Sequence, residues 1–255
     1  MAAASATVDR RRRWLLAGIA SGAGLASVLP GCGGLGSDDE VTLRAVNATL
    51  DVASIDVQFD DWQFAGAVAY GGTGSGHARR SLWAVDPSGP FEVRRAGRTS
   101  ILLREAKTLT GGDAASVVVM GTLSAGLSLR VIGEDAERPG AAAARLRLLH
   151  AWPMVGAVDV FITLQDQTLA GRTPDHRLGA YDALSAFADA NGGGRLRITP
   201  AGRTDLVLFD CPTIGLAARQ AATLVLCPTP GPAGVAVAVL PQGLPAYVLA
   251  DVGAP

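Results

Sequence analysis

His150 and Asp159 are the residues whose chemistry is most suggestive, since they lie nine positions apart in consecutive apolar segments. A histidine beside an aspartate can act as an oriented general base, and imidazole and carboxylate are common metal ligands. The chain also carries Asn47 and Asp56 at the same spacing, however. Asparagine cannot act as a base, but it hydrogen-bonds the backbone much as a neutral imidazole does. We therefore expect a structural role for His150 and Asp159 first, with ligand contact, metal binding and catalysis as alternatives.

The sequence has no other signature of catalysis or metal binding. His77 and His176 have no second His or Cys at metal-ligand spacing. The glycine-rich segment 71–76 lacks the lysine and the following helix of a phosphate-binding loop, and no Gly-x-Ser-x-Gly elbow occurs. The sequence predicts no catalytic residue, no metal site and no cofactor.

Two tryptophans are candidates for ligand contact of another kind, because an exposed ring on a sandwich face or loop tip can stack on a sugar. Trp62 follows Asp60 and Asp61, and Trp83 lies further along the same half of the chain. Large rings also anchor small cores built mainly of Ala, Val and Leu. We expect core packing first and keep glycan contact open for both.

The N-terminal residues have the order of an export signal. A basic run, 10–13, leads into the Gly/Ala-rich apolar stretch 14–30, which ends in Leu29-Pro30-Gly31-Cys32. The stretch is shorter than the roughly 20 apolar residues of a membrane-spanning helix. Leu-x-Gly-Cys resembles the lipobox of bacterial lipoproteins, which implies that residues 1–31 are removed and that Cys32 is acylated.

This resemblance also implies an address. Residues 32–40 become a lipidated cysteine and a flexible acidic tether. Gly33 follows the cysteine, so the aspartate that retains Gram-negative lipoproteins in the inner membrane is absent, and the outer membrane is favoured for a Gram-negative host. Residues 11–16 are similar to the twin-arginine export motif, so the twin-arginine and general routes both stay open. We expect an exported protein, lipid-anchored in the bacterial cell envelope.

Cys211 and Cys227 each precede a proline at the end of an apolar segment. An even pair of cysteines in an oxidising compartment predicts a disulfide. The alternative is two buried free thiols that pack as small hydrophobic groups. We expect the bridge.

The rest of the chain is an internal duplication. Four segments recur at a shift that grows only from 103 to 107 residues. They are 43–48 with 146–151, 54–57 with 157–160, 96–99 with 201–204, and 117–120 with 224–227. So small a drift indicates two tandem domains with short loop insertions, too few copies for a solenoid.

Each copy consists of short apolar runs between turns rich in Gly, Pro, Asp and Ser, which is typical of strands. Six or seven strands a copy suit a sandwich in which each sheet buries one face. Helical periodicity is weak except at 183–190. The sequence predicts an all-β protein with two tandem Ig-like β-sandwich domains, 41–133 and 145–251, joined by a linker at 134–144.

The second copy carries a recognisable motif. Arg147-Leu148-Leu149-His150-Ala151-Trp152-Pro153, continuing to Val158-Asp159-Val160-Phe161, resembles the opening of a bacterial extracytoplasmic family, domain of unknown function 4397. The segment 201–204 looks like a later turn of that family. The first copy matches more loosely, with Asn47 in place of the histidine. The resemblance covers nearly all of the mature chain and implies exported, often lipid-anchored Ig-like domains with no established activity.

Composition bounds the function. The formal net charge is −1, and residues 1–31 hold four arginines and Asp9, which leaves 18 basic against 22 acidic residues. A mildly acidic protein has no electrostatic reason to bind nucleic acid. We expect a non-enzymatic envelope lipoprotein, held to the membrane by its lipid, that acts as a binding or spacer module for an envelope protein or glycan. The alternatives are glycan or peptidoglycan binding through loop aromatics and, less favoured, an enzyme with a site between the copies.

Overall fold

The computed structural model describes residues 40–74, 76–134, 139–229 and 234–252. The expected signal peptide, Cys32 and most of the tether lie outside these residues. The described residues all belong to one compact unit, Leu35–Pro255. Within them, no helix has the length and apolar character needed to cross a membrane.

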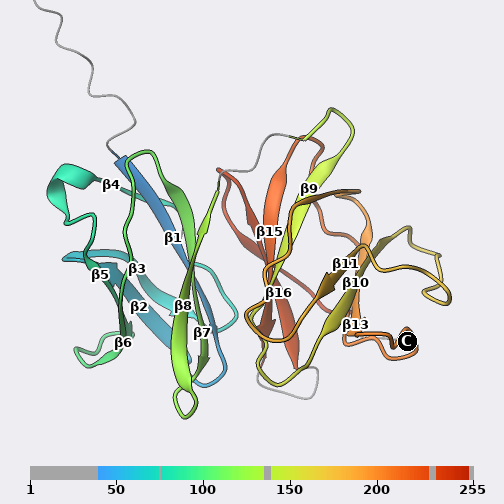
Figure 1. Cartoon of the computed structure of the whole chain (residues 1–255), viewed down its shortest axis with the longest axis horizontal. Helices are drawn as coiled ribbons and strands as arrows, with labels where there is room; N and C mark the ends of the chain where they lie inside the picture. Colours follow the sequence, from blue (N-terminus) through green and yellow to red (C-terminus); the bar gives the residue numbers. More distant parts are fainter. Residues whose placement is uncertain (1–39, 75, 135–138, 230–233, 253–255) are drawn as a thin grey trace, which may run out of the picture. The chain divides into compact units, whose positions relative to one another are not determined.

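The first half of the described chain forms eight strands and one short 3-10 helix (Figure 1). The elements are β1 (Glu40–Thr49), β2 (Ser54–Phe59), β3 (Trp62–Ala69), β4 (Ala78–Ser81), η2 (Leu82–Ala84), β5 (Pro90–Arg95), β6 (Ile101–Ala106), β7 (Ala114–Thr122) and β8 (Gly126–Gly133). They make two sheets, ordered β4-β1-β7-β8 and β3-β2-β5-β6.

The second half forms nine strands. They are β9 (Ala144–His150), β10 (Val158–Thr163), β11 (His176–Leu178), β12 (Ala188–Ala190), β13 (Arg195–Pro200), β14 (Phe209–Cys211), β15 (Ala221–Pro228), β16 (Val235–Pro241) and β17 (Tyr247–Leu249). Their sheets are ordered β12-β9-β15-β16-β17 and β11-β10-β13-β14.

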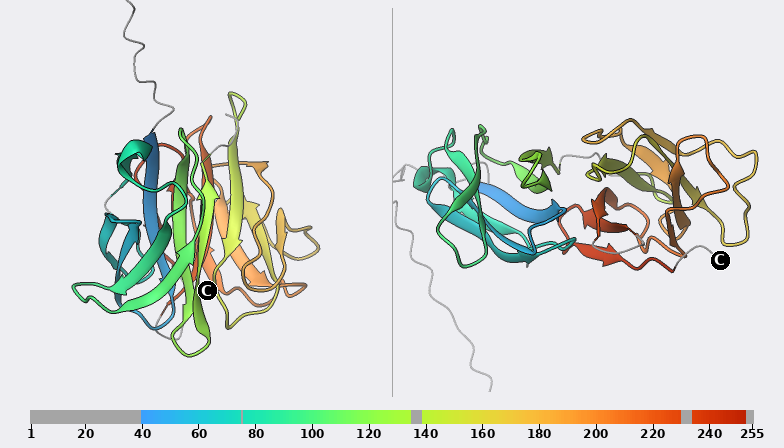
Figure 2. Two further views of the ribbon diagram at one scale, coloured as in Figure 1. Left: turned by 60° about the vertical axis from the view of Figure 1, so that its left-hand side comes forward. Right: turned by 90° about the horizontal axis from the view of Figure 1, so that it is seen from below.

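The two halves share one topology, strand for strand, with β17 added at the end. Figure 2 shows the strands of both halves from two further sides. β1 pairs in parallel with β7, and β9 pairs in parallel with β15, whereas the other pairs are antiparallel. The expected all-β sandwich class is confirmed, with more strands in each half than the six or seven expected. The weak helical pattern at 183–190 was misleading: Leu184 bridges Leu149, and Ala188–Ala190 pairs with β9.

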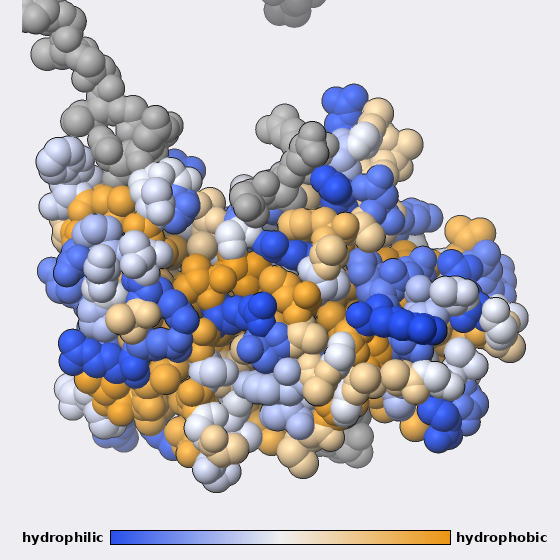
Figure 3. Space-filling view, in the orientation of Figure 1, coloured by the Kyte–Doolittle hydropathy of each residue, from blue (hydrophilic) through white to orange (hydrophobic). Residues whose placement is uncertain are grey.

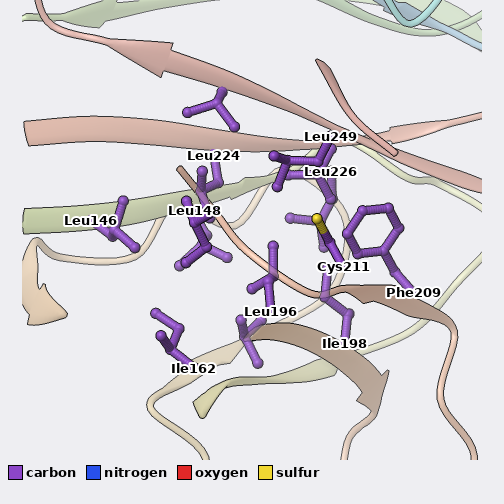
Figure 4. Close-up of a cluster of buried hydrophobic side chains, with 14 of the residues drawn as sticks. Leu146, Leu148, Ile162, Leu196, Ile198, Phe209, Cys211, Leu224, Leu226 and Leu249 are labelled. Carbon is purple, nitrogen blue, oxygen red and sulfur yellow. The ribbon is translucent and has the colours of Figure 1, made fainter. Parts of the chain in front are cut away.

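Each sandwich has its own apolar core between its two sheets. In the first, β2 alternates buried and half-buried residues, so that Ile55, Val57 and Phe59 point inward. The Phe59 and Phe91 rings lie 4.7 Å apart there. In the second, leucines from β9 and β15 meet Leu196 and Ile198 of β13 (Figure 4).

A third apolar cluster joins the two halves. Its members come from the outer faces of β1, β7 and β8 in one half and β9, β15 and β16 in the other. They are Val46, Ala48, Val118, Met120, Ile132, Leu149, Ala151, Val225, Cys227, Ala238 and Leu240. Because both faces of β1 and β15 are covered, nearly all residues of the two strands are buried, and β15 reads as a near-continuous apolar run. Each half contributes matching positions, such as Val46 and Leu149, which lie 103 residues apart.

The expected disulfide is wrong. Cys211 and Cys227 are both free and buried. The Cys211 side chain lies in the core of the second sandwich, near Phe209, Leu226 and Leu249 (Figure 4). Cys227 lies on β15 with its side chain in the third cluster. Since successive residues of a strand point to opposite faces, Leu226 faces the core of the second sandwich and Cys227 faces away from Cys211.

One cross-strand pair differs in polarity between the halves. Glu92 on β5 lies opposite Arg104 on β6, with Arg104 Nε 3.5 Å from Glu92 Oε1. At the corresponding place in the second sandwich, Arg197 on β13 lies opposite Asp210 on β14. The acidic residue therefore lies on the inner strand β5 in the first half but on the edge strand β14 in the second, and the arginine lies on the other strand of each pair.

Candidate functional site

His150 closes the turn that follows β9. Its Nδ1 accepts a hydrogen bond from the Trp152 backbone N–H (3.3 Å), and its Nε2 donates to the Gly156 carbonyl (2.9 Å). These partners require the neutral tautomer with the proton on Nε2. Burial lowers the pKa of His150 below its ordinary value, which also favours the neutral ring. The side chain is fully buried and therefore presents no surface to a ligand.

Asn47 makes the same clasp in the first half. Its Oδ1 accepts from the Thr49 backbone N–H (3.2 Å), and its Nδ2 donates to the carbonyls of Val52 (2.9 Å) and Val68 (3.2 Å). Both side chains thus accept from the backbone two residues ahead and donate into the turn beyond. This is the structural role expected from the exchange of Asn for His.

Asp56 and Asp159 hold a second turn in each half. The Gly97 N–H donates to Asp56 Oδ2 (2.9 Å), and the Gly202 N–H donates to Asp159 Oδ2 (2.8 Å). His150 and Asp159 therefore serve different turns, and the structure gives them no shared hydrogen-bond partner. In the described segments, no group of three or more His, Cys, Asp and Glu side chains could hold a metal ion.

The Oδ1 atoms of Asp56 and Asp159 differ in their hydrogen-bond partners. Asp56 Oδ1 accepts from the Ala67 N–H (2.8 Å). Asp159 Oδ1 has no hydrogen-bond donor, although Arg177 Nε lies 3.4 Å away in a loosely aligned ion pair. Nothing in the sequence marks Arg177 as a partner of Asp159, because the chain between β10 and β11 has no counterpart in the short β2–β3 turn of the first half.

Each of these aspartates borders a surface pocket. The pocket of the second sandwich, about 470 Å³, is lined by Ala157, Asp159, Arg177, Leu178, Gly179, Ala201 and Gly202. The pocket of the first sandwich, about 130 Å³, is lined by Asp56, Gln58, Gln63, Arg94, Gly97, Arg98 and Thr99. Asp56 and Gly97 line the first pocket, and the corresponding Asp159 and Gly202 line the second. The two pockets therefore occupy corresponding places in the two sandwiches.

The two candidate tryptophans lie in opposite environments. Trp62 is only 9% exposed, and its ring packs 5.6 Å from that of Phe64 in the first core. Trp83 is 82% exposed on η2, which Leu82 and Val85 anchor to that core. No other large hydrophobic side chain among the described residues is as exposed. The face drawn in Figure 3 mixes hydrophobic and hydrophilic residues.

A buried ionic cluster lies where the two halves meet. Glu134 accepts from the Ser116 hydroxyl (2.8 Å) and from the Gly243 N–H (3.4 Å). It also forms an ion pair with Arg44, whose Nε lies 2.8 Å from Glu134 Oε1 and donates to the Ser116 hydroxyl oxygen. His77 Nε2 lies 3.1 Å from the same carboxylate. The Arg44 and Glu134 side chains are 1% and 5% exposed. The cluster ties the last turn of the second half to the first and leaves no open site.

Two arginines at corresponding positions, one in each half, donate a hydrogen bond to a backbone carbonyl of the other half. Arg44 Nη1 donates to the Leu244 carbonyl (3.0 Å), and Arg147 Nη2 donates to the Gly133 carbonyl. The two arginines are 103 residues apart, so the repeat itself carried the signal that could have identified them.

A family described as a domain of unknown function (DUF4397) matches residues 41–161. The matched range contains both clasp residues, Asn47 and His150, and ends within β10. No curated protein matches the chain.

One similar solved structure is that of CBMbc (family CBM26) from Eubacterium rectale Amy13K in complex with maltoheptaose. It shares 13% identity with this chain at a TM-score of 0.22, and the alignment covers 85% of this chain and 98% of that one. At so low a TM-score, the likeness carries no argument about function.

Proposed function

We propose that this chain is an exported lipoprotein, anchored through Cys32 in the bacterial cell envelope, and that its two sandwiches act as a non-enzymatic binding or spacer module. One observation carries the non-enzymatic part. The polar side chains that could do chemistry, His150 and Asp159, are engaged by backbone groups as Asn47 and Asp56 are in the first half. An arrangement that works equally with asparagine has no need of a base.

The anchor is supported by the sequence around Cys32 and by the place where β1 begins. Glu40, the first residue of β1, lies eight residues after the cysteine. Eight extended residues span at most about 29 Å, so the lipid would hold the first sandwich close to the membrane. Stable anchoring needs more than one acyl chain, which lipoprotein acylation supplies.

The test is the Cys32→Ser variant of the full chain. We expect it to leave the membrane fraction after a carbonate wash while keeping the β-type circular dichroism spectrum of the parent. Ser37→Ala, in the same tether, is the matched control and should stay with membranes. A Cys32→Ser protein that remains membrane-bound after the wash contradicts the lipoprotein assignment.

A second candidate function, glycan or peptidoglycan binding, is favoured by Trp83. An 82% exposed tryptophan on an anchored turn offers a ring face for sugar stacking. Trp83→Ala should reduce retention on insoluble peptidoglycan, whereas Met154→Ala, which removes an exposed side chain of the second sandwich, should not. Equal retention of both variants and the parent removes Trp83 from any binding role.

A further inference from the structure

The second sandwich has open space where an edge strand fills the first. β3 runs for eight residues beside β2, but β11 runs for only three beside β10. The β2–β3 pairing shifts register between Ile55 and Val57, and Ala67 adopts a positive φ of 49°. This irregularity turns the Ala67 N–H toward Asp56 Oδ1.

β11 pairs with β10 so that Arg177 lies directly opposite Asp159. No backbone amide takes the place of the Ala67 N–H. The Asp159 side chain is 5% exposed and lines the pocket of about 470 Å³, yet its Oδ1 receives no hydrogen bond. A buried carboxylate oxygen without a donor is costly, and only the loosely aligned Arg177 compensates for it.

Arg177 can give way to a ligand. Its side chain is 74% exposed, and its Nε lies 3.4 Å from Asp159 Oδ1. The arginine end of the pair is exposed, so water can solvate the guanidinium when it leaves Asp159. The guanidinium can rotate out of the pocket and donate to a bound molecule while Asp159 Oδ1 accepts from it.

We propose that this pocket binds a carbohydrate through two adjacent hydroxyl groups, one donating to Asp159 and the other accepting from Arg177. The guanidinium disfavours a metal ion or a free ammonium group, and the carboxylate disfavours phosphate. A neutral ligand with a hydrogen-bond donor beside an acceptor satisfies both the Asp159 carboxylate and the Arg177 guanidinium. Ala157, Ala201 and Gly202 leave room for a sugar ring. The inference rests on the proposed binding role and specifies its ligand class.

The experiment uses the full mature chain carrying Cys32→Ser, so that the protein is free of lipid. Ligand-observed NMR would measure binding of glucose, N-acetylglucosamine and maltose, with N-methylacetamide as an amide probe, each up to about 10 mM. Arg177→Ala should weaken sugar binding by about tenfold or more, as loss of a charged hydrogen bond does. Ala157→Phe should abolish binding by filling the pocket, since Ala157 is an exposed lining residue.

Arg98→Ala, which removes an exposed lining side chain of the smaller pocket, is the control and should bind sugar as the parent does. The proposal is overturned if no sugar binds, if binding survives Arg177→Ala and Ala157→Phe, or if N-methylacetamide alone binds there. Membrane fractionation of Cys32→Ser is read separately, so failure of the lipoprotein assignment is distinguishable from failure of this pocket.

Discussion

Removing the Glu134 carboxylate should destabilise both sandwiches at once. In Glu134→Gln, the Arg44 guanidinium stays buried and loses the carboxylate oxygen that lies 2.8 Å from its Nε. Burial already lowers the pKa of Arg44, and Glu134 opposes that shift. Breaking a buried ion pair by removing one partner typically costs about 3–5 kcal/mol. The lower end applies here, because the glutamine can still accept from Ser116.

A loss of about 3 kcal/mol corresponds to a fall in Tm of about 6–12 °C for a chain of this length. Urea unfolding and calorimetry of the mature chain would measure it. Glu105→Gln is the matched control, since the Glu105–Lys107 pair is partly exposed and such pairs contribute about 0–1 kcal/mol. A loss below about 1 kcal/mol in Glu134→Gln would refute the reasoning, because it would mean that water reaches the Arg44 guanidinium.

Three further outcomes follow from the structure. Burial raises the pKa of the Cys227 thiol to about 12, and Cys211 is also buried. Neither thiol should therefore react with a thiol reagent until the protein unfolds, and a reductant should leave the Tm unchanged. A Tm that falls on reduction would show that the two cysteines form a disulfide. Burial lowers the pKa of His150 and of His176, so both fold as neutral rings and the stability they allow is lost as the pH falls below about 6.5. His150→Asn should reduce this loss between about pH 7 and pH 5, measured as the urea midpoint, and an unchanged slope would contradict it. The segment 41–133 expressed alone should show a β-type spectrum but self-associate by analytical ultracentrifugation, because it exposes its part of the third cluster; a stable monomer would show that this face tolerates water.

Much of the fold followed from the sequence because duplication makes one half a control for the other. The shift of 103 residues aligned Asn47 with His150, and their exchange predicted a backbone clasp. Which residues of β15 face the core of the second sandwich and which face the other half could not be predicted in this way. All eight of its residues are buried, so no alternation of exposed and buried positions marks Cys227 as facing the other sandwich rather than the core.

The pocket beside Asp159 was harder to predict for a related reason. It exists because β11 is short and the chain before it is long, and an insertion has no counterpart from which its path could be inferred. The sequence identified Asp159 as a candidate but could not separate its two oxygens. Trp62 and Trp83 likewise look alike in sequence, and only the η2 turn decides that one is buried and the other exposed.

The exchanged polarity of the Glu92–Arg104 and Arg197–Asp210 positions bears on how the chain avoids folding errors. Tandem domains of one topology can misassemble by exchanging strands. If β5 paired with β14, Glu92 would face Asp210, and if β13 paired with β6, Arg197 would face Arg104. Like charges directly opposite one another destabilise an antiparallel pair. The exchanged polarity therefore disfavours pairing of either strand with the corresponding strand of the other half.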